Sequence, residues 1–373
     1  AQAQYGADVI MRANYALEHG TEALSMCVRK AVNEMLGSLA EDAGIRREDV
    51  FQVCVVGNTC MHHLFLGISP ASLVHAPYTP AVSERLVLNA GDYGLAVQER
   101  AELIMLSDIA GYVGADTCGC LLAIRQDQQE EISLMIDIGT NGEMVLGNRE
   151  RMVTCSTAAG PAFEGAKIEC GMRGAAGAVD HVKYEDGKWN YTTVGNKPAV
   201  GLCGSGLIDL VAGLLDAGML DENGVLRSGQ EKQGVFILVP PERGGNERGV
   251  YLTQKDLGEV QFAKAAIAAG IQMLMERLGI TEDDICSVYI AGAFGNYMDP
   301  VSAGKIGLLP ATLVKKVKPV GNAAGEGAKI ALVNEKEMLE MDELVRKIEF
   351  VELAASADFQ DHFIDELGFE TGE

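Results

Sequence analysis

The sequence predicts a duplicated α/β fold with mixed sheets flanked by helices. One observation behind this prediction is a repeat: a helix, an acidic linker, a short apolar strand and a glycine turn occur at 22–59 and again at 254–296. The other is a row of three short strands around a glycine-rich turn at 132–155, which predicts an antiparallel meander. The chain has 373 residues, enough for two domains and a large buried core.

The repeat extends over four successive elements. Apolar residues recur at three- and four-residue steps over 22–43, which predicts a helix, and the strand at 51–56 follows it. The same spacing predicts a second helix that begins near residue 254, with a strand at 287–291 after it. A shift of 235 positions superposes the two copies and aligns Gly44 with Gly279, Asp49 with Asp284, and Gly57 with Gly292. The register predicts two copies of one α/β unit.

The second copy opens with a distinctive glycine-rich turn. Strands are predicted at 132–136, 144–146 and 152–155, and the polar turn at 137–143 joins the first two. In Walker and dinucleotide-binding loops a helix follows the glycines, and neither G-x-x-x-x-G-K-[ST] nor G-x-G-x-x-G occurs in this chain. The sequence therefore argues against P-loop ATPases and Rossmann dehydrogenases.

Three further segments follow this meander. Residues 184–193 predict a surface hairpin, and a turn at 203–206 precedes a predicted helix at 207–215. Residues 224–250 are rich in glycine, proline and charge, which predicts an exposed excursion.

Composition and charge exclude several classes of protein. Apolar residues make up 48% and charged residues 22%, the proportions of a globular protein rather than a disordered one. The 53 acidic residues outnumber the 30 basic ones, and the net charge of −23 disfavours non-specific binding to nucleic acid or anionic membranes. No stretch approaches the roughly 20 apolar residues of a membrane span, and the first residues do not resemble a secretory signal. We expect a cytoplasmic protein without nucleic-acid or membrane partners.

The nine cysteines are scattered and odd in number, which indicates reduced thiols in apolar surroundings. Cys118 and Cys120 are the one close pair, and their spacing matches neither a zinc site nor a ferredoxin cluster. The sequence favours buried thiols over a metal site there.

The glycine turns are candidate ligand sites. Asp137 ends a strand beside Gly139, Thr140 and Gly142, where backbone amides can meet a phosphate and the carboxylate can hold hydrated Mg²⁺. The alternative is a tight hairpin turn that Asp137 caps. Two further turns are open between ligand binding and plain chain reversal: 204–206, whose amides could face an anion, and 292–296, on which a base or ribose could lie. The pair His62 and His63 favours a structural role.

The order of these motifs, with STAAGPAFEGA at 156–166 and AGAFGN at 291–296, resembles the superfamily of acetate kinases, sugar kinases, heat-shock chaperones and actin (ASKHA). That resemblance implies two ribonuclease-H-like halves that close on a nucleotide, here 1–130 and 131–373. Within the superfamily, the chain is most similar to the ATP-dependent reductive activators of corrinoid (vitamin B12, cobalamin) proteins. The segments that carry this likeness lie at 55–70, 109–117, 136–148, 155–178, 201–209, 291–300 and 358–367.

This likeness implies an enzyme that restores Co(II) corrinoid proteins of anaerobic methyl transfer to Co(I). ATP binding or hydrolysis would be coupled to partner binding and electron transfer, with ATP and Mg²⁺ as cofactors. The implied partner is the corrinoid protein of a methyltransferase or O-demethylase, or a corrinoid iron–sulfur protein, and related activators are often dimers, so a homodimer is expected. Two alternatives remain: a nucleotide-sensing docking module without turnover, and a small-molecule kinase of the same fold.

Two features of such activators are expected outside this chain. One is a [2Fe–2S] domain that delivers the electron from the donor, because no C-x₄-C-x₂-C run occurs here. The other is the first half's phosphate loop, which would precede the helix at 22–43, while residues 1–21 contain no such loop. Whether this chain alone turns over ATP is therefore left open.

The resemblance also assigns roles to individual residues. Asp137 would hold the metal and take part in catalysis, and Asp108 and Asp116, in the segment like the helix that connects the halves, would orient a water or the metal. Ser156, Thr157 and 171–177 are candidates for the partner face that closure would alter. The expected nucleotide-binding residues are Gly139, Thr140, Asn141 and Gly142 in the phosphate loop, Gly160 and Glu164 after it, Gly204, Ser205 and Gly206, and Gly292, Ala293, Phe294, Gly295 and Asn296 in the adenosine turn.

Overall fold

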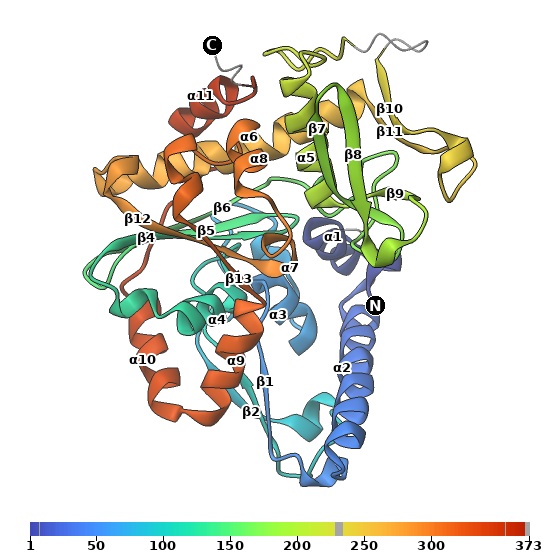
Figure 1. Cartoon of the computed structure of the whole chain (residues 1–373). Coiled ribbons are helices and arrows are strands. Elements are labelled where there is room, and N and C mark those ends of the chain that lie inside the picture. Colours follow the sequence, from blue (N-terminus) through green and yellow to red (C-terminus); the bar gives the residue numbers. More distant parts are fainter. Residues whose placement is uncertain (7, 228–233, 355, 370–373) are drawn as a thin grey trace. The chain divides into compact units, whose positions relative to one another are not determined.

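The computed structural model describes residues 1–6, 8–227, 234–354 and 356–369 (Figure 1). The chain forms two compact units: unit 1 consists of 1–128 and 322–350, and unit 2 of 129–321 and 351–373. The segment 322–350 therefore groups with unit 1, and the division into halves at 130 stays a prediction. Each unit is described by itself.

Unit 2 is built on a mixed sheet. Strands β4 (Ile132–Ile138), β5 (Gly142–Gly147) and β6 (Met152–Thr157) form the antiparallel meander that the sequence predicts. Strand β12 (Ile285–Ala291) lies parallel to β4, and β13 (Val317–Gly321) lies parallel to β12. The order β13-β12-β4-β5-β6 places β4 between two strands, which explains its nearly continuous apolar sequence.

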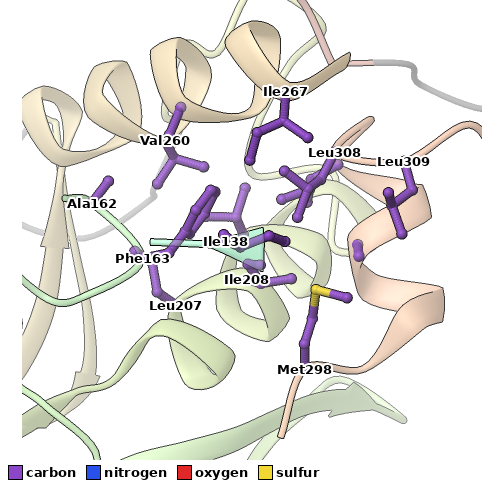
Figure 2. Close-up of a cluster of buried hydrophobic side chains, with 14 of the residues drawn as sticks. Ile138, Ala162, Phe163, Leu207, Ile208, Val260, Ile267, Met298, Leu308 and Leu309 are labelled. Carbon is purple, nitrogen blue, oxygen red and sulfur yellow. The ribbon is translucent and has the colours of Figure 1, made fainter. Parts of the chain in front are cut away.

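Helix α6 (Gln254–Leu278) packs on this sheet over β5 and β6 (Figure 1). It begins at a capping box formed by Thr253 and Asp256. Its side chains Val260 and Ile267 are fully buried. Figure 2 shows both of them pointing into a cluster that includes Ile138, at the end of β4. The core of unit 2 therefore lies directly beneath the end of the strand that carries Asp137.

A second sheet in unit 2 has the order β8-β7-β9, with β7 (Ala178–Glu185), β8 (Lys188–Thr193) and β9 (Gly201–Leu202). Helix α5 (Gly204–Asp216) packs on β7. The excursion at 224–250 is largely exposed at 241–248, as expected, but the expectation is wrong for most of 235–239 and for 249–250. There β10 (Val235–Val239) pairs with β11 (Val250–Thr253), and Phe236 is 1% exposed with its ring centroid 4.9 Å from that of Trp189. Residues 228–233 lie outside the described residues.

The remaining helices of unit 2 are short. They are α7 (Gly292–Gly295), α8 (Pro300–Lys305) and α11 (Ala357–Asp365). The turn predicted after β12 is thus a single helical turn, α7.

Unit 1 has a smaller sheet of order β1-β3-β2. Strand β1 (Gln52–Val55) is parallel to β3 (Glu102–Met105), and β2 (Leu86–Asn89) is antiparallel to β3. The other elements of this unit are α1 (Val9–His19), α2 (Glu22–Ala43), α3 (Thr59–Leu66), α4 (Ala115–Ile124), α9 (Ala323–Val333), α10 (Glu335–Val345) and the short strand β14 (Glu349–Phe350). Helices α4 and α9 pack closely because Gly119 and Gly327 meet there; a Cβ on Gly327 would overlap the carbonyl of Gly119.

The predicted repeat is confirmed in the backbone. Helices α2 and α6 both end at a left-handed glycine, Gly44 (φ 66°) and Gly279 (φ 71°), which are 235 positions apart. The 3₁₀ helices η2 (Arg47–Asp49) and η8 (Glu282–Asp284) follow with the same shift. In each, the last carboxylate accepts from the backbone amide that precedes the helix: Asp49 from Arg46 at 3.1 Å, and Asp284 from Thr281 at 2.9 Å. In unit 2, β12 then pairs with the meander through β4. Among the described residues of unit 1, β1 pairs with β3 alone.

Candidate functional site

Strand β4 sets the direction of the Asp137 side chain. Successive side chains of a strand point to opposite faces, and Ile136 and Ile138, on either side of Asp137, are 0% and 4% exposed. Figure 2 shows Ile138 within the apolar cluster. Asp137 therefore points away from this core, at the edge of the sheet where the strand ends, and is half-buried.

The structure brings the predicted phosphate loop and adenosine turn together. Asp137 of β4 pairs in register with Ala291 of the parallel strand β12, so Gly292 follows directly beside it. A Cβ on Gly292 would lie 2.9 Å from Oδ1 of Asp137, and the residue has φ 86°. Glycine is required here both for the left-handed backbone and for the close approach of the carboxylate.

Burial changes the acidity of Asp137. Removal of the carboxylate from water raises its pKa from 3.8 to about 6. A bound cation would restore the charged form, because an adjacent positive charge favours ionisation. The site thus fits a metal ligand, because the carboxylate lies where a Cβ on Gly292 would be only 2.9 Å away and a bound cation would stabilise its ionised form.

Thr157, the last residue of β6, and Glu164, which follows that strand, form hydrogen bonds to the predicted phosphate loop. Gly142 lies opposite Thr157, whose hydroxyl donates to the carbonyl of Gly142 at 3.3 Å. The hydroxyl of Thr140 donates to Oε2 of Glu164 at 2.5 Å, and within the loop the amide of Gly139 donates to the carbonyl of Asn141 at 2.9 Å. The structure therefore brings Glu164 to the phosphate loop across 24 positions of sequence.

Gly160 and Lys167 flank Glu164 in the sequence and lie close to each other in space. Gly160 has φ 76°, and the ammonium of Lys167 is 3.9 Å from the position of a Cβ on Gly160. Sequence reasoning did not single out Lys167. Its backbone adopts a left-handed conformation that is uncommon for a residue with a side chain, and no sequence pattern predicts that.

The glycines at 204–206 are explained first by packing. The helix was predicted to begin after them, but α5 begins at Gly204. A Cβ on Gly204 would overlap the carbonyl of Phe163 and lie 2.7 Å from the ring of Phe294, and a Cβ on Gly206 would overlap the carbonyl of Val179. Together with Ser205, which is 3% exposed, they let α5 approach β7 and the phenylalanine pair. These contacts explain why both positions are glycine, and the predicted role of the turn in nucleotide binding stays a prediction.

Two aromatic rings connect the loop after β6 with the turn after β12. Phe163 and Phe294 stack with centroids 5.7 Å apart and planes inclined by 19°. Phe163 is 4% exposed, whereas Phe294 is half-buried and Asn296 is exposed. The amide group of Asn296 lies beside Gly321 at the end of β13. Phe294 of α7 and its C-cap Asn296 thus lie within four residues of Gly292.

Asp108 and Asp116 belong to unit 1, whereas the loop and the glycine turns belong to unit 2. Asp108 is 3% exposed; its Oδ1 accepts from the amide of Ala115 at 2.9 Å, and its Oδ2 lies 3.3 Å from Nδ1 of His62. Asp116 accepts from the amide of Thr117 at 2.9 Å in the first turn of α4. The His62–Asp108 pair was not anticipated, because its members are 46 positions apart. The catalytic roles of both aspartates stay predictions.

No group of three or more His, Cys, Asp or Glu side chains within the described ranges has the arrangement of a metal site. None of the helices that the structure describes is both long and apolar enough to cross a membrane.

Comparison with known families decides the assignment. Residues 131–373 match the C-terminal domain of RACo, the ASKHA domain, and residues 1–129 match the RACo middle region. The chain belongs to the RACo family. Its α/β architecture of mixed sheets flanked by helices is therefore the ASKHA fold predicted from the motifs.

Relatives of this RACo-family chain are named for corrinoid chemistry. It is 35% identical over 381 residues to the corrinoid activation enzyme RamQ of Eubacterium limosum, covering 97% of this chain and 64% of RamQ. It is 27% identical over 399 residues to the [Co(II) methylated amine-specific corrinoid protein] reductase of Methanosarcina barkeri, covering 98% and 71%. A solved reductive activator for corrinoid, iron-sulfur protein superposes with TM-score 0.90 and 38% identity over 99% of this chain and 60% of that one. The chain thus spans less than two thirds of the length of RamQ and of that solved protein.

Proposed function

We propose that this RACo-family chain is the ATP-binding part of an enzyme that reductively activates a corrinoid protein, restoring Co(II) to Co(I). The observation that carries the proposal is the junction of Asp137 and Gly292, which joins the phosphate loop to the adenosine turn at one edge of the sheet. The names of the relatives support the corrinoid protein as substrate. In this proposal the electron arrives through a [2Fe–2S] domain outside this chain.

The residues of unit 2 have separate tasks. The backbone amides of the loop 139–142, except that of Gly139, which is bonded to the carbonyl of Asn141, would donate to phosphate oxygens, and the ionised carboxylate of Asp137 would hold hydrated Mg²⁺. Glu164 orients the hydroxyl of Thr140, and the glycine at 292 leaves room for the nucleotide beside the carboxylate. Mg-ATP, when bound, supplies the free energy of its binding and hydrolysis.

Nucleotide is needed because Co(I) is a strong reductant, so the electron moves uphill. Binding can help only if the nucleotide changes the affinity of the chain for one cobalt state over the other. A tenfold difference in affinity shifts a one-electron potential by 59 mV. Modest changes in the partner face are therefore sufficient to matter.

We place that partner face on the glycine-rich segment 171–177, whose residues 173–176 are exposed. Ser156, the other candidate from the sequence, is half-buried, and its hydroxyl donates to Oε1 of Glu143 in β5 at 3.2 Å. Thr157, also considered from the sequence, is 2% exposed and bonded to Gly142, so it is not available to a partner. A homodimer and a cytoplasmic location stay predictions.

The test is calorimetric titration with Mg-ATP of the wild-type chain and of Asp137→Ala. Reduction of a Co(II) corrinoid protein by an added low-potential one-electron donor is followed alongside by its visible spectrum. Wild-type binding that disappears in the variant, together with reduction that needs ATP, is the expected result. Equal binding by both proteins would exclude Asp137 from the site. Phosphate transfer to acetate or a sugar would instead favour a kinase.

A further inference from the structure

The segment that carries Lys167 is held at several points. Phe163 and Ile168 are 4% and 5% exposed in the core of unit 2, and the amide of Glu169 donates to Oδ1 of Asp256 at 2.9 Å, at the start of α6. Lys167 lies between these anchors with φ 66°. A residue with a side chain persists in this conformation only where its surroundings enforce it. The fold therefore fixes the backbone position of Lys167.

The surroundings of the Lys167 ammonium are acidic. Its Nζ lies 3.5 Å from Oε2 of Glu259, on α6, and beside Gly160. The phosphate loop carries two acidic side chains, Asp137 and Glu143, and Glu164, three positions before Lys167, is bonded to Thr140 of that loop. An anionic polyphosphate approaching these carboxylates would be repelled unless a cation faced it. Lys167 is placed to meet that need.

The ion pair with Glu259 is of the kind that exchanges easily. The side chains of Lys167 and Glu259 are 57% and 27% exposed. Ion pairs of such exposure contribute little to stability, because water screens them and both side chains lose rotamer freedom. A phosphate can offer the ammonium a charge-assisted hydrogen bond of about 2.7–2.9 Å, shorter than the 3.5 Å contact with Glu259.

We propose that Lys167 binds the polyphosphate of the nucleotide, and that Glu259 holds it aside in the nucleotide-free protein. This inference rests on the proposed function, because it names a cation of the same nucleotide site. The inference predicts that two substitutions change the affinity for polyphosphate in opposite directions. Removing the charge of Lys167 weakens polyphosphate binding, and removing the charge of Glu259 strengthens it by freeing the ammonium.

The experiment is titration of the whole chain with Mg-ATP, Mg-ADP and adenosine. Lys167→Gln is expected to weaken binding of Mg-ATP about tenfold, the effect of one charge-assisted hydrogen bond, and to leave adenosine unchanged. Lys167→Arg should restore most of the loss, and Glu259→Gln should tighten Mg-ATP binding. The control is Lys188→Gln on the exposed strand β8, which removes the same charge elsewhere in unit 2. Circular dichroism checks that each variant is folded.

The outcomes separate the two proposals. Unchanged Mg-ATP affinity in folded Lys167→Gln overturns the inference and leaves the proposed function standing. Weaker Mg-ATP binding by Glu259→Gln overturns the inference that Glu259 holds Lys167 aside in the nucleotide-free protein. Absence of Mg-ATP binding by the wild-type chain overturns the proposed function and this inference with it.

Discussion

Burial of Asp137, the proposed metal ligand, lowers the stability of the folded protein once the carboxyl group is ionised. Its pKa of about 6, against 3.8 in water, means that the unfolded chain releases this proton at lower pH than the folded protein. Stability therefore falls as pH rises from about 4 through about 6, and stays lower above that range. The ionised carboxylate costs the folded protein on the order of 1–3 kcal/mol.

The variant Asp137→Asn is predicted to gain most of that free energy at pH 8 while losing Mg-ATP binding. Urea denaturation at pH 8 and pH 5 measures the first effect, and calorimetric titration measures the second. The gain should shrink toward pH 5, because the wild-type carboxyl group is then largely protonated in the folded state. A variant less stable than wild type at pH 8 would show that Asp137 is not penalised by burial.

Gly292 gives a second prediction at this scale, with a matched control. Gly292→Ala places a Cβ 2.9 Å from Oδ1 of Asp137 and is predicted to abolish nucleotide binding. Gly187→Ala, in the hairpin between β7 and β8, imposes the same left-handed strain at φ 75° with nothing within 4 Å of the new Cβ. Each variant should lose about 1 kcal/mol of stability from backbone strain. Only the first should lose Mg-ATP in a titration, and equal affinities would contradict the proposed site.

At the scale of elements, the contact between α4 and α9 depends on two small residues. Gly327→Ala is predicted to destabilise unit 1 by about 2 kcal/mol, because a Cβ there overlaps the carbonyl of Gly119 and the helices must separate. The control is Gly258→Ala in α6, where a Cβ meets nothing within 4 Å. That change should instead stabilise by about 0.5–1 kcal/mol, through helix propensity. Thermal melts of both variants check the opposite signs.

Local patterns predicted these elements well wherever one period dominated. The apolar spacing over 22–43 gave the bounds of α2. The alternation around 137–143 gave the meander, and the shift of 235 gave the paired glycine caps. Each of these features depends on residues that are close together in the sequence, so a local pattern is sufficient to predict it.

The remaining features depend on distant parts of the chain. The excursion at 224–250 is polar in composition, yet Phe236 packs against Trp189 of the β7–β8 hairpin and is buried. The turn at 204–206 belongs to α5 because the carbonyls of Phe163 and Val179 require glycines beside them. For the candidate site, motifs predicted the loop and the adenosine turn. The partners that brace them, such as Glu164 for Thr140, come from packing that no short motif encodes.

At the scale of the whole molecule, the proposed function requires that nucleotide and corrinoid protein affect one another. Thermodynamic linkage makes this reciprocal: a factor by which Mg-ATP changes affinity for the partner must equal the factor by which the partner changes affinity for Mg-ATP. The phosphate loop and the proposed partner face at 171–177 both belong to unit 2, whereas Asp108, with its predicted role, belongs to unit 1. Titration of the whole chain therefore tests the linkage.

We predict a coupling factor of about 5–150 between Mg-ATP and the Co(II) form of the corrinoid protein, the usual range for linked sites. Titrations of each ligand in the presence and absence of the other give the factor twice, and the two values must agree. If the factor differs tenfold between the Co(II) and Co(I) forms, the midpoint potential of the bound corrinoid shifts by 59 mV on addition of a non-hydrolysable ATP analogue. In Asp137→Ala the factor should be 1 and the shift zero, while affinity for the partner without nucleotide is retained. A nucleotide-independent potential in the wild-type complex would mean that ATP acts on some step other than the electron transfer.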